Sequence, residues 1–317
     1  MKSEMNTTIN DTQAQQNQPI LLGDSSWLPW HYVAKEGFIL RGLRTVPRGL
    51  PVLHFIHGNS YSGLTYLPLW QQLAPYFDIF LHDAQGHGDS DHGGKFVGWQ
   101  RSADLAREVW AGFAPEYASV LKIGMGHSFG GALTSLMSVA NPTMFSQLLL
   151  LDPMLFPQPM IRWAMPLGSI GLNPIARKAR RRRMLWPDRE TALASLRGRG
   201  MFRGWHEDAL AAYVDHAMHD STEGRALKCL PQREAEVFSS YIRKLWPQLR
   251  QVEAPTHSFI GSDTYPFLHR SMADWQQAHP ELNITSMQGG HCFMQENPAV
   301  TAQEILAAVA HQYTPKA

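Results

Sequence analysis

The chain has 317 residues, of which 44% are hydrophobic and 17% charged, proportions that suit a packed globular protein. Its formal net charge of +1 provides no overall field to attract nucleic acid or an anionic membrane. Cys229 and Cys292 are too few for a disulfide framework, and no apolar run approaches the ~20 residues of a membrane span.

The first 18 residues are rich in Asn, Gln and Thr and show no apolar periodicity, so we expect residues 1–18 to be a disordered tail. Lys2 is an early positive charge, but no apolar h-region follows it, so we expect no signal peptide. The low cysteine content also fits a reducing compartment. These features favour a cytoplasmic protein and leave a homodimer open.

Strand and helix patterns alternate between residues 30 and 152. A mixed apolar segment over 30–46 predicts a β-hairpin, and the short apolar runs that follow predict buried strands. We expect strands at 52–56, at 79–81, from Val120 and at 148–151, and helices at 66–73, at 103–113 and after Ser128. This alternation predicts a parallel sheet covered by helices on both faces.

The alternation breaks over residues 153–250, where the patterns are helical and no convincing strand is found. It resumes with strands at 257–260 and 282–287. A last helix begins at Asn297-Pro298, with asparagine as the N-cap and proline in the first turn. We therefore predict an α/β fold with a mostly parallel core of residues 19–152 and 251–317, and a helical cap inserted at 153–250.

The most informative motif is Gly126-His127-Ser128-Phe129-Gly130, which stands between a strand pattern and a helix pattern. In that context G-x-S-x-G predicts a nucleophile elbow, a sharp turn that exposes the serine hydroxyl at the strand tip. Side chains two positions either side of the serine would collide there, which accounts for the two glycines. We expect the side chain of His127 to point away from Ser128.

A serine hydroxyl needs a base to act as a nucleophile, and the base needs an orienting acid. His291, in Gly289-Gly290-His291, follows the last predicted strand, and Asp263 follows the strand before it. Both loops leave carboxyl ends of strands, where open α/β sheets place their sites. The order Ser128, Asp263, His291 is the order found with this elbow.

With these motifs the chain resembles the α/β-hydrolase fold superfamily, in its branch of capped serine hydrolases, over residues 30–313. The resemblance extends to His57-Gly58-Asn59-Ser60, an H-G-x loop after a central strand, and to residues 83–90, which are similar to the structural D-x-x-G-x-G-x-S turn of the family. It implies an oxyanion hole made by the backbone N–H groups of Asn59 and Phe129. It also implies that no cofactor or metal is required.

The position of the proposed triad acid, Asp263, relative to the preceding glycine differs from the usual spacing of the family. The family has G-x-x-D, whereas this chain has Gly261-Ser262-Asp263. Some family members take the acid from an earlier strand end, and here Asp152 follows the strand at 148–151. We prefer Asp263 on chain order and keep Asp152 as the alternative acid.

Three other features have simpler interpretations than a functional one. Residues 87–94 nearly match the H-x-H-x-D-H metal motif of metallo-β-lactamase-like hydrolases, but Asp89 replaces a histidine and no comparably spaced later ligands follow. The basic run at 177–183 could bind an acidic partner, yet such a run is more typical of the solvated face of a cap helix. Cys292 is interpreted as a buried small hydrophobe.

The cap sequence is rich in Met, Trp, Leu and Phe, which favours an apolar substrate site. We therefore predict a serine hydrolase that cleaves a small to medium, largely apolar carboxylic ester through an acyl-enzyme. Two alternatives use the same triad, a carbon–carbon bond hydrolase and a perhydrolase-type enzyme. A third is a ligand-binding receptor with weak hydrolysis.

Overall fold

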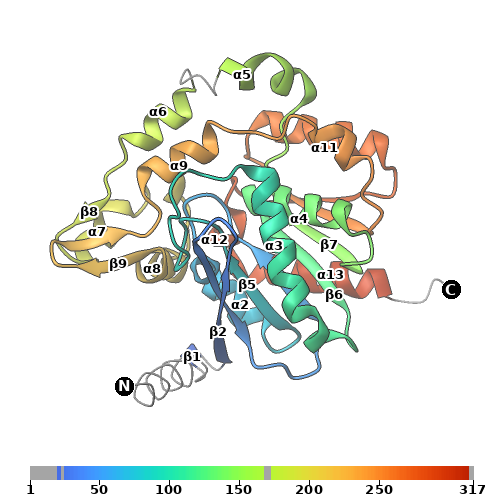
Figure 1. Cartoon of the computed structure of the whole chain (residues 1–317), viewed down its shortest axis with the longest axis horizontal. Coiled ribbons are helices and arrows are strands. Elements are labelled where there is room, and N and C mark those ends of the chain that lie inside the picture. The colour runs from blue at the N-terminus through green and yellow to red at the C-terminus, as the bar shows by residue number, and fades with distance from the viewer. Residues whose placement is uncertain (1–19, 23–24, 168–172, 314–317) are drawn as a thin grey trace.

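The computed structural model of the chain describes residues 20–22, 25–167 and 173–313, so the tail predicted at 1–18 lies outside the described residues. Within those residues the centre is a nine-stranded sheet (Figure 1). In sheet order its strands are β1 (Ile20–Leu22), β2 (Ser25–Val33), β3 (Ile39–Thr45), β5 (Asp78–Asp83), β4 (Val52–Ile56), β6 (Lys122–His127), β7 (Gln147–Leu151), β11 (Thr256–Gly261) and β12 (Asn283–Met287). The predicted α/β fold with a mostly parallel sheet is confirmed.

The sheet has an antiparallel edge and a parallel body. The predicted hairpin is formed by β2 and β3, which place Trp30 opposite Gly42. β3 pairs antiparallel with β5, whereas neighbours among β5, β4, β6, β7, β11 and β12 pair in parallel. The carboxyl ends of the parallel strands therefore share one edge, where the loops with the candidate site residues begin.

Helices cover both faces of this sheet. Figure 1 shows α3 (Trp99–Phe113) and α4 (Phe129–Ala140) in front of it. The other helical segments of the core are η1 (Gly63–Tyr66), α2 (Leu67–Leu73), η2 (Ala114–Tyr117), α11 (Pro266–Ala278), α12 (Phe293–Glu296) and α13 (Pro298–Tyr313). α2 and α13 contact each other. The predicted N-cap of the last helix is confirmed, since Asn297 Oδ1 accepts a hydrogen bond from the Val300 N–H at 3.2 Å.

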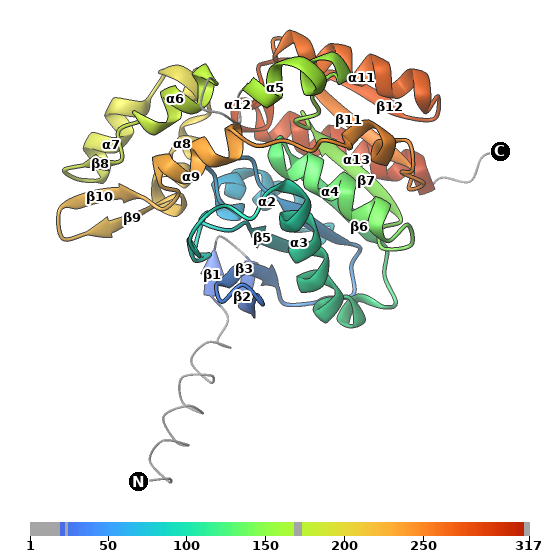
Figure 2. The ribbon, with the colours of Figure 1, turned by 45° about the horizontal axis from the view of Figure 1, so that its top comes forward.

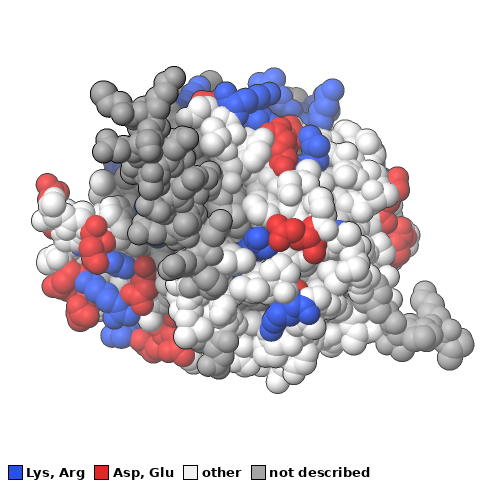
Figure 3. All heavy atoms as spheres, turned by 60° about the horizontal axis from the view of Figure 1, so that its bottom comes forward, with Lys and Arg blue, Asp and Glu red and all other residues white. Residues whose placement is uncertain are grey.

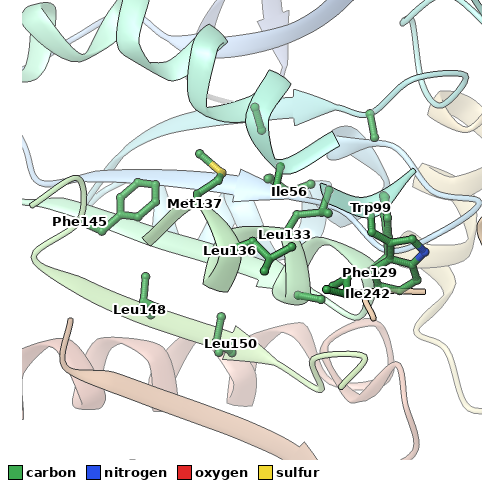
Figure 4. Packing of buried hydrophobic residues seen from close by; sticks show 14 of the residues in the cluster. Ile56, Trp99, Phe129, Leu133, Leu136, Met137, Phe145, Leu148, Leu150 and Ile242 are labelled. Carbon is green, nitrogen blue, oxygen red and sulfur yellow. The ribbon is translucent and has the colours of Figure 1, made fainter. Parts of the chain in front are cut away.

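Alternate residues of the buried strands enter two separate hydrophobic cores. In β4, Val52 and Ile56 join the cluster that contains α3 and α4 residues, whereas Leu53 and Phe55 join the cluster that contains α2 and α13 residues. Figure 4 shows side chains of the first cluster packed between α4 and the strands. Because the strands are buried on both faces, they read as continuous apolar runs in the sequence.

Residues 153–250 leave the sheet after β7 and return before β11, and Figure 2 shows much of this insertion to one side of the large sheet. Its elements are η3 (Met160–Ala164), α5 (Met165–Leu167), α6 (Pro174–Arg180), β8 (Leu185–Trp186), α7 (Arg189–Leu196), η5 (Gly200–Phe202), α8 (Glu207–His216), β9 (Met218–Ser221), β10 (Gly224–Leu227), α9 (Pro231–Phe238) and α10 (Leu245–Leu249). The expectation that the insertion holds no strand is wrong, because β8, β10 and β9 form a small antiparallel sheet. These strands have only two to four residues, too few to produce an alternating pattern.

In the part of the chain that the structure describes, no helix has the length and apolar character needed to cross a membrane. The face in Figure 3 carries separate small groups of acidic and basic residues, and most of its described surface is uncharged. This distribution agrees with the net charge of +1.

Buried histidines are an unexpected part of the interior, namely His54, His57, His82, His87 and His127. The His54 ring packs against Phe80 and Trp110, with ring centroids 5.4 and 5.0 Å away. Neither His54 ring nitrogen has a hydrogen-bond partner among the described residues. Burial lowers the pKa of His54 to about 3, so the ring is neutral in the folded protein at neutral pH.

We expect His54 to make the folded protein less stable in acid. The unfolded chain binds a proton on this ring near pH 6.5, whereas the folded chain binds it only near pH 3. The free energy of unfolding therefore falls as pH drops between these values, by up to about 1.4 kcal/mol per pH unit for this residue. His54→Leu removes that contribution, and urea unfolding of both proteins across this range measures it. Equal slopes for the two proteins would contradict the prediction.

Candidate active site

Three side chains converge at the carboxyl edge of the sheet. Ser128 follows β6, Asp152 follows β7, and His291 lies between β12 and α12. His291 Nε2 is 2.8 Å from Ser128 Oγ, and His291 Nδ1 is 2.5 Å from Asp152 Oδ2. These distances allow the imidazole to take a proton from the hydroxyl while the carboxylate orients the ring.

The serine sits on a strained turn between β6 and α4. Its φ of 53° is in the left-handed region, which a residue with a side chain rarely adopts. A Cβ atom at Gly126 would lie 2.4 Å from Gly130 O, and one at Gly130 would lie 2.0 Å from Ile56 O. The steric reason given for both glycines is therefore confirmed, and the turn has the geometry of a nucleophile elbow.

The structure gives Asp152 three hydrogen-bond donors, although the residue has no exposed surface. The Gly261 N–H donates to Oδ1 at 3.0 Å, and the Thr264 hydroxyl and the His291 ring lie on Oδ2. Burying a carboxylate is costly unless its oxygens are hydrogen-bonded. This donor set meets that cost and fixes the carboxylate against the imidazole.

The preference for Asp263 over Asp152 is corrected by this geometry. Asp263 is an exposed residue, and its backbone N–H donates to Gly289 O at 2.9 Å. Its loop begins after β11, whereas β7, which ends before Asp152, lies next to β6, the strand that ends at the elbow. The carboxylate that reaches His291 thus comes from the alternative position, and the G-x-D spacing was the sequence signal for it.

The two backbone amides of the predicted oxyanion hole have no protein acceptor within the described residues. Asn59 lies in the buried loop after β4, and Phe129 is the first residue of α4. The Asn59 side chain is held from two sides, because its Oδ1 is 3.0 Å from His87 Nε2 and its Nδ2 donates to Glu234 O at 3.2 Å. The loop is therefore fixed while its amide stays available to a ligand.

Aromatic rings approach the site from α11 and from the segment after β7. The Tyr265 ring lies 5.2 Å from the His291 ring and stacks on Phe267, which stacks on Phe156. Figure 4 shows Phe129 and Trp99 close together near one end of α4. Neither Thr264 nor Tyr265 belongs to a motif, so sequence reasoning missed both, and only their position after β11 could have drawn attention to them.

The other residues singled out in the sequence have structural contacts. His57 accepts the Ala84 N–H at Nε2, 3.0 Å away, and burial lowers its pKa to about 4. Asp83 accepts the N–H groups of Gly63 and Asp89, which holds the 83–90 turn together. No group of three or more His, Cys, Asp or Glu side chains among the described residues could hold a metal ion.

The basic run at 177–183 divides between exposed and paired side chains. Arg182 bonds to Glu234 at 2.9 Å and to the Tyr213 hydroxyl, and Arg183 donates to Leu185 O. Arg177, Lys178, Arg180 and Arg181 are exposed.

Cys292 is buried beside His291, with its Sγ 3.3 Å from the Tyr61 hydroxyl. Burial raises the pKa of this thiol to about 12, so the sulfur stays protonated and unreactive at neutral pH.

Comparison with known proteins gives consistent matches. A sequence profile of the alpha/beta hydrolase family matches residues 55–304. Abhydrolase domain-containing protein AKT2 of Alternaria alternata is 36% identical over 101 residues, which are 32% of this chain and 35% of that protein. Type I acyl-CoA thioesterase mpaH of Penicillium roqueforti is 34% identical over 94 residues, 29% of this chain and 20% of that protein. The matches thus span about a third or less of these relatives.

The solved structures agree on the fold. The peroxisomal alpha-beta-hydrolase Lpx1 of Saccharomyces cerevisiae superposes with a TM-score of 0.74 at 16% identity, over 95% of this chain and 92% of that one. At that identity the likeness concerns the fold alone.

The contacts of Gly130 predict a large effect of adding one methyl group. Gly130→Ala should lower the free energy of unfolding by about 1–3 kcal/mol or more, because its Cβ would meet the Ile56 carbonyl oxygen. Gly112→Ala in α3 is the matched control, since no described residue comes within 4 Å of its Cβ position. That change should stabilise the protein by about 0.5–1 kcal/mol. Urea unfolding compares them, and similar values would contradict the steric argument.

Proposed function

The chain belongs to the alpha/beta hydrolase family, and from this we propose that it is a serine hydrolase of small to medium, largely apolar carboxylic esters. One observation carries the proposal. A single imidazole, that of His291, lies within hydrogen-bond distance of both the Ser128 hydroxyl and the Asp152 carboxylate. This is the arrangement that turns a serine into a nucleophile.

In the proposed reaction Ser128 Oγ attacks the acyl carbonyl while His291 Nε2 takes the hydroxyl proton. The tetrahedral intermediate collapses when His291 returns that proton to the leaving alcohol, which leaves an acyl-serine. A water molecule then attacks the acyl group with His291 again as the base, and the acid leaves. Asp152 holds His291 Nδ1–H and stabilises the ring while it is charged.

The backbone N–H groups of Asn59 and Phe129 are proposed to bind the oxyanion. Phe129 begins α4, so its amide also carries the partial positive charge of a helix N-terminus. Loss of one such donor costs about 3–4 kcal/mol of transition-state stabilisation in other hydrolases. The hydrogen bonds that hold the Asn59 side chain support this role, because a donor must be fixed before charge develops.

The aromatic rings of Phe156, Phe267 and Tyr265 favour an apolar acyl or aryl group close to His291.

A thioester is a second candidate substrate, because one of the relatives is named an acyl-CoA thioesterase. The same acyl transfer applies, with a thiolate in place of the alkoxide. Short-chain nitrophenyl esters and matched thioesters distinguish the two.

Ser128 is expected to react covalently with a fluorophosphonate probe and to turn over short-chain nitrophenyl esters. Ser128→Ala should lose both activities while keeping its fold, because the alcohol oxygen is the nucleophile. Intact-mass spectrometry and ester hydrolysis measure the two effects. Tight ligand binding by an unreactive serine would instead support a receptor.

The choice of acid is tested by a matched pair of substitutions. Asp152→Asn should lower kcat about 10³–10⁴-fold, because the amide cannot hold His291 in the required tautomer. Asp263→Asn should stay within about two-fold of the parent protein, since surface changes away from a site have small effects. Ester hydrolysis with circular dichroism as a check on folding compares them. The opposite ranking would reinstate Asp263.

A further inference from the structure

A hydrogen-bonded chain connects the loop after β4 to the backbone of His291. The Gly58 N–H donates to Tyr66 Oη at 3.1 Å, and Tyr66 Oη lies 2.6 Å from His127 Nδ1. His127 Nε2 in turn lies 3.0 Å from His291 O. We propose that Tyr66 and His127 are positioning residues that hold the oxyanion loop and the catalytic base at a fixed separation. This proposal rests on the hydrolase function proposed above.

The donor and acceptor of each hydrogen bond in this series follow from its last member, the His291 carbonyl oxygen. A carbonyl oxygen only accepts, so His127 Nε2 carries the proton that points at His291 O. Burial lowers the pKa of His127 well below its usual value, so the ring is neutral and Nδ1 is an acceptor. The Tyr66 hydroxyl must then donate to Nδ1, and burial keeps it protonated by raising its pKa. One tautomer of His127 and one orientation of the Tyr66 hydroxyl therefore give all three hydrogen bonds a donor and an acceptor.

The His127 ring is closely packed against its neighbours. A Cβ atom at Gly58 would lie 2.7 Å from His127 Nδ1, so only glycine lets the loop approach the ring this closely. Tyr61 stacks on His127, with its ring 5.9 Å from that of His127 and an interplanar angle of 17°. Both ring nitrogens of His127 thus have partners, Tyr66 Oη and His291 O, and its ring lies 4.9 Å from the ring of His291.

The hydrogen-bonded series joins the proposed oxyanion loop to the proposed base, and the reaction depends on the distance between these two parts of the site. Gly58 directly precedes Asn59, the proposed oxyanion donor, and the other end is the carbonyl of His291 itself. An apolar pair in place of Tyr66 and His127 could fill the same space. It would leave the Gly58 N–H and the His291 carbonyl without these partners, and neither loop would be held to the other. Small misplacements of reacting groups have large effects on rate.

The test compares two substitutions that each remove one buried phenol oxygen. Tyr66→Phe interrupts the series of hydrogen bonds between Gly58 and His291. Tyr117→Phe makes the same chemical change in η2, which precedes β6, and lies in the other hydrophobic core. Tyr66→Phe should lower kcat for a nitrophenyl ester about 10-fold with little change in KM, because the two hydrogen bonds that hold the Gly58 loop to His127 are lost and the reacting groups are less well placed. Tyr117→Phe should leave kcat within about two-fold.

Two substitutions of His127 provide a second test. Their kcat values should differ if the His127 hydrogen bonds matter, and should not differ if His127 only fills space. His127→Phe removes the donor to His291 O, whereas His127→Gln keeps an N–H group near the Nε2 position. We expect His127→Gln to recover most of the kcat that His127→Phe loses. The low-field proton resonance of His291 Nδ1–H should broaden in Tyr66→Phe and in His127→Phe, since the ring would be less firmly held.

The outcomes separate this proposal from the one on which it rests. If Ser128→Ala keeps ester hydrolysis, the hydrolase assignment itself fails. If Ser128→Ala is inactive but Tyr66→Phe matches Tyr117→Phe in kcat, the triad stands and the positioning role is overturned. If His127→Gln and His127→Phe have equal activity and equally lowered unfolding midpoints, Tyr66 and His127 only pack in the core and the positioning role is likewise overturned.

Discussion

The buried carboxylate of Asp152 is the group on which the candidate site depends. Its charge has no access to water, and its donors come from the end of β11, from the loop before α11 and from the loop after β12. Those donors are together only when the parallel strands are assembled in register. Formation of the sheet edge and accommodation of this charge are therefore one event, and a misassembled edge would leave a carboxylate unsolvated.

Backbone strain is concentrated at the same edge. Ser128 and Asp152, at the ends of adjacent strands, both have positive φ, at 53° and 44°. Neighbouring strands hold them there, because the Ser128 N–H donates to Leu151 O and the Asp152 N–H donates to Phe259 O. Residues in such conformations persist only where the surroundings overdetermine them. Here the surroundings are the ladder of the central sheet, which lets the site keep side chains in conformations that a loop would release.

Local patterns sufficed for the features that each depend on one stretch of chain. The alternation of strands and helices, the elbow around Ser128 and the loop with His291 all came from such patterns. The choice between Asp152 and Asp263 could not, because both satisfy the order of serine, acid and histidine. It was decided by which carboxylate lies against His291 Nδ1 in the folded protein, and that carboxylate is Asp152. The short strands β8 to β10 and the contacts of Thr264, Tyr66 and His127 also depend on partners far away in the sequence.

The attachment of α9 has a consequence for protein engineering. Although α9 lies within the inserted segment, its residues bond to the core at several points. The Glu234 carbonyl accepts from Asn59, and Arg233 donates to the carbonyls of His92 and Gly94. A chimera that exchanges lids between relatives to change substrate range would cut these anchors if it replaced the whole insertion. Because α9 is also bonded to the rest of the insertion, through Arg182 and Glu234, such a chimera has to preserve the bonds of α9 on both sides.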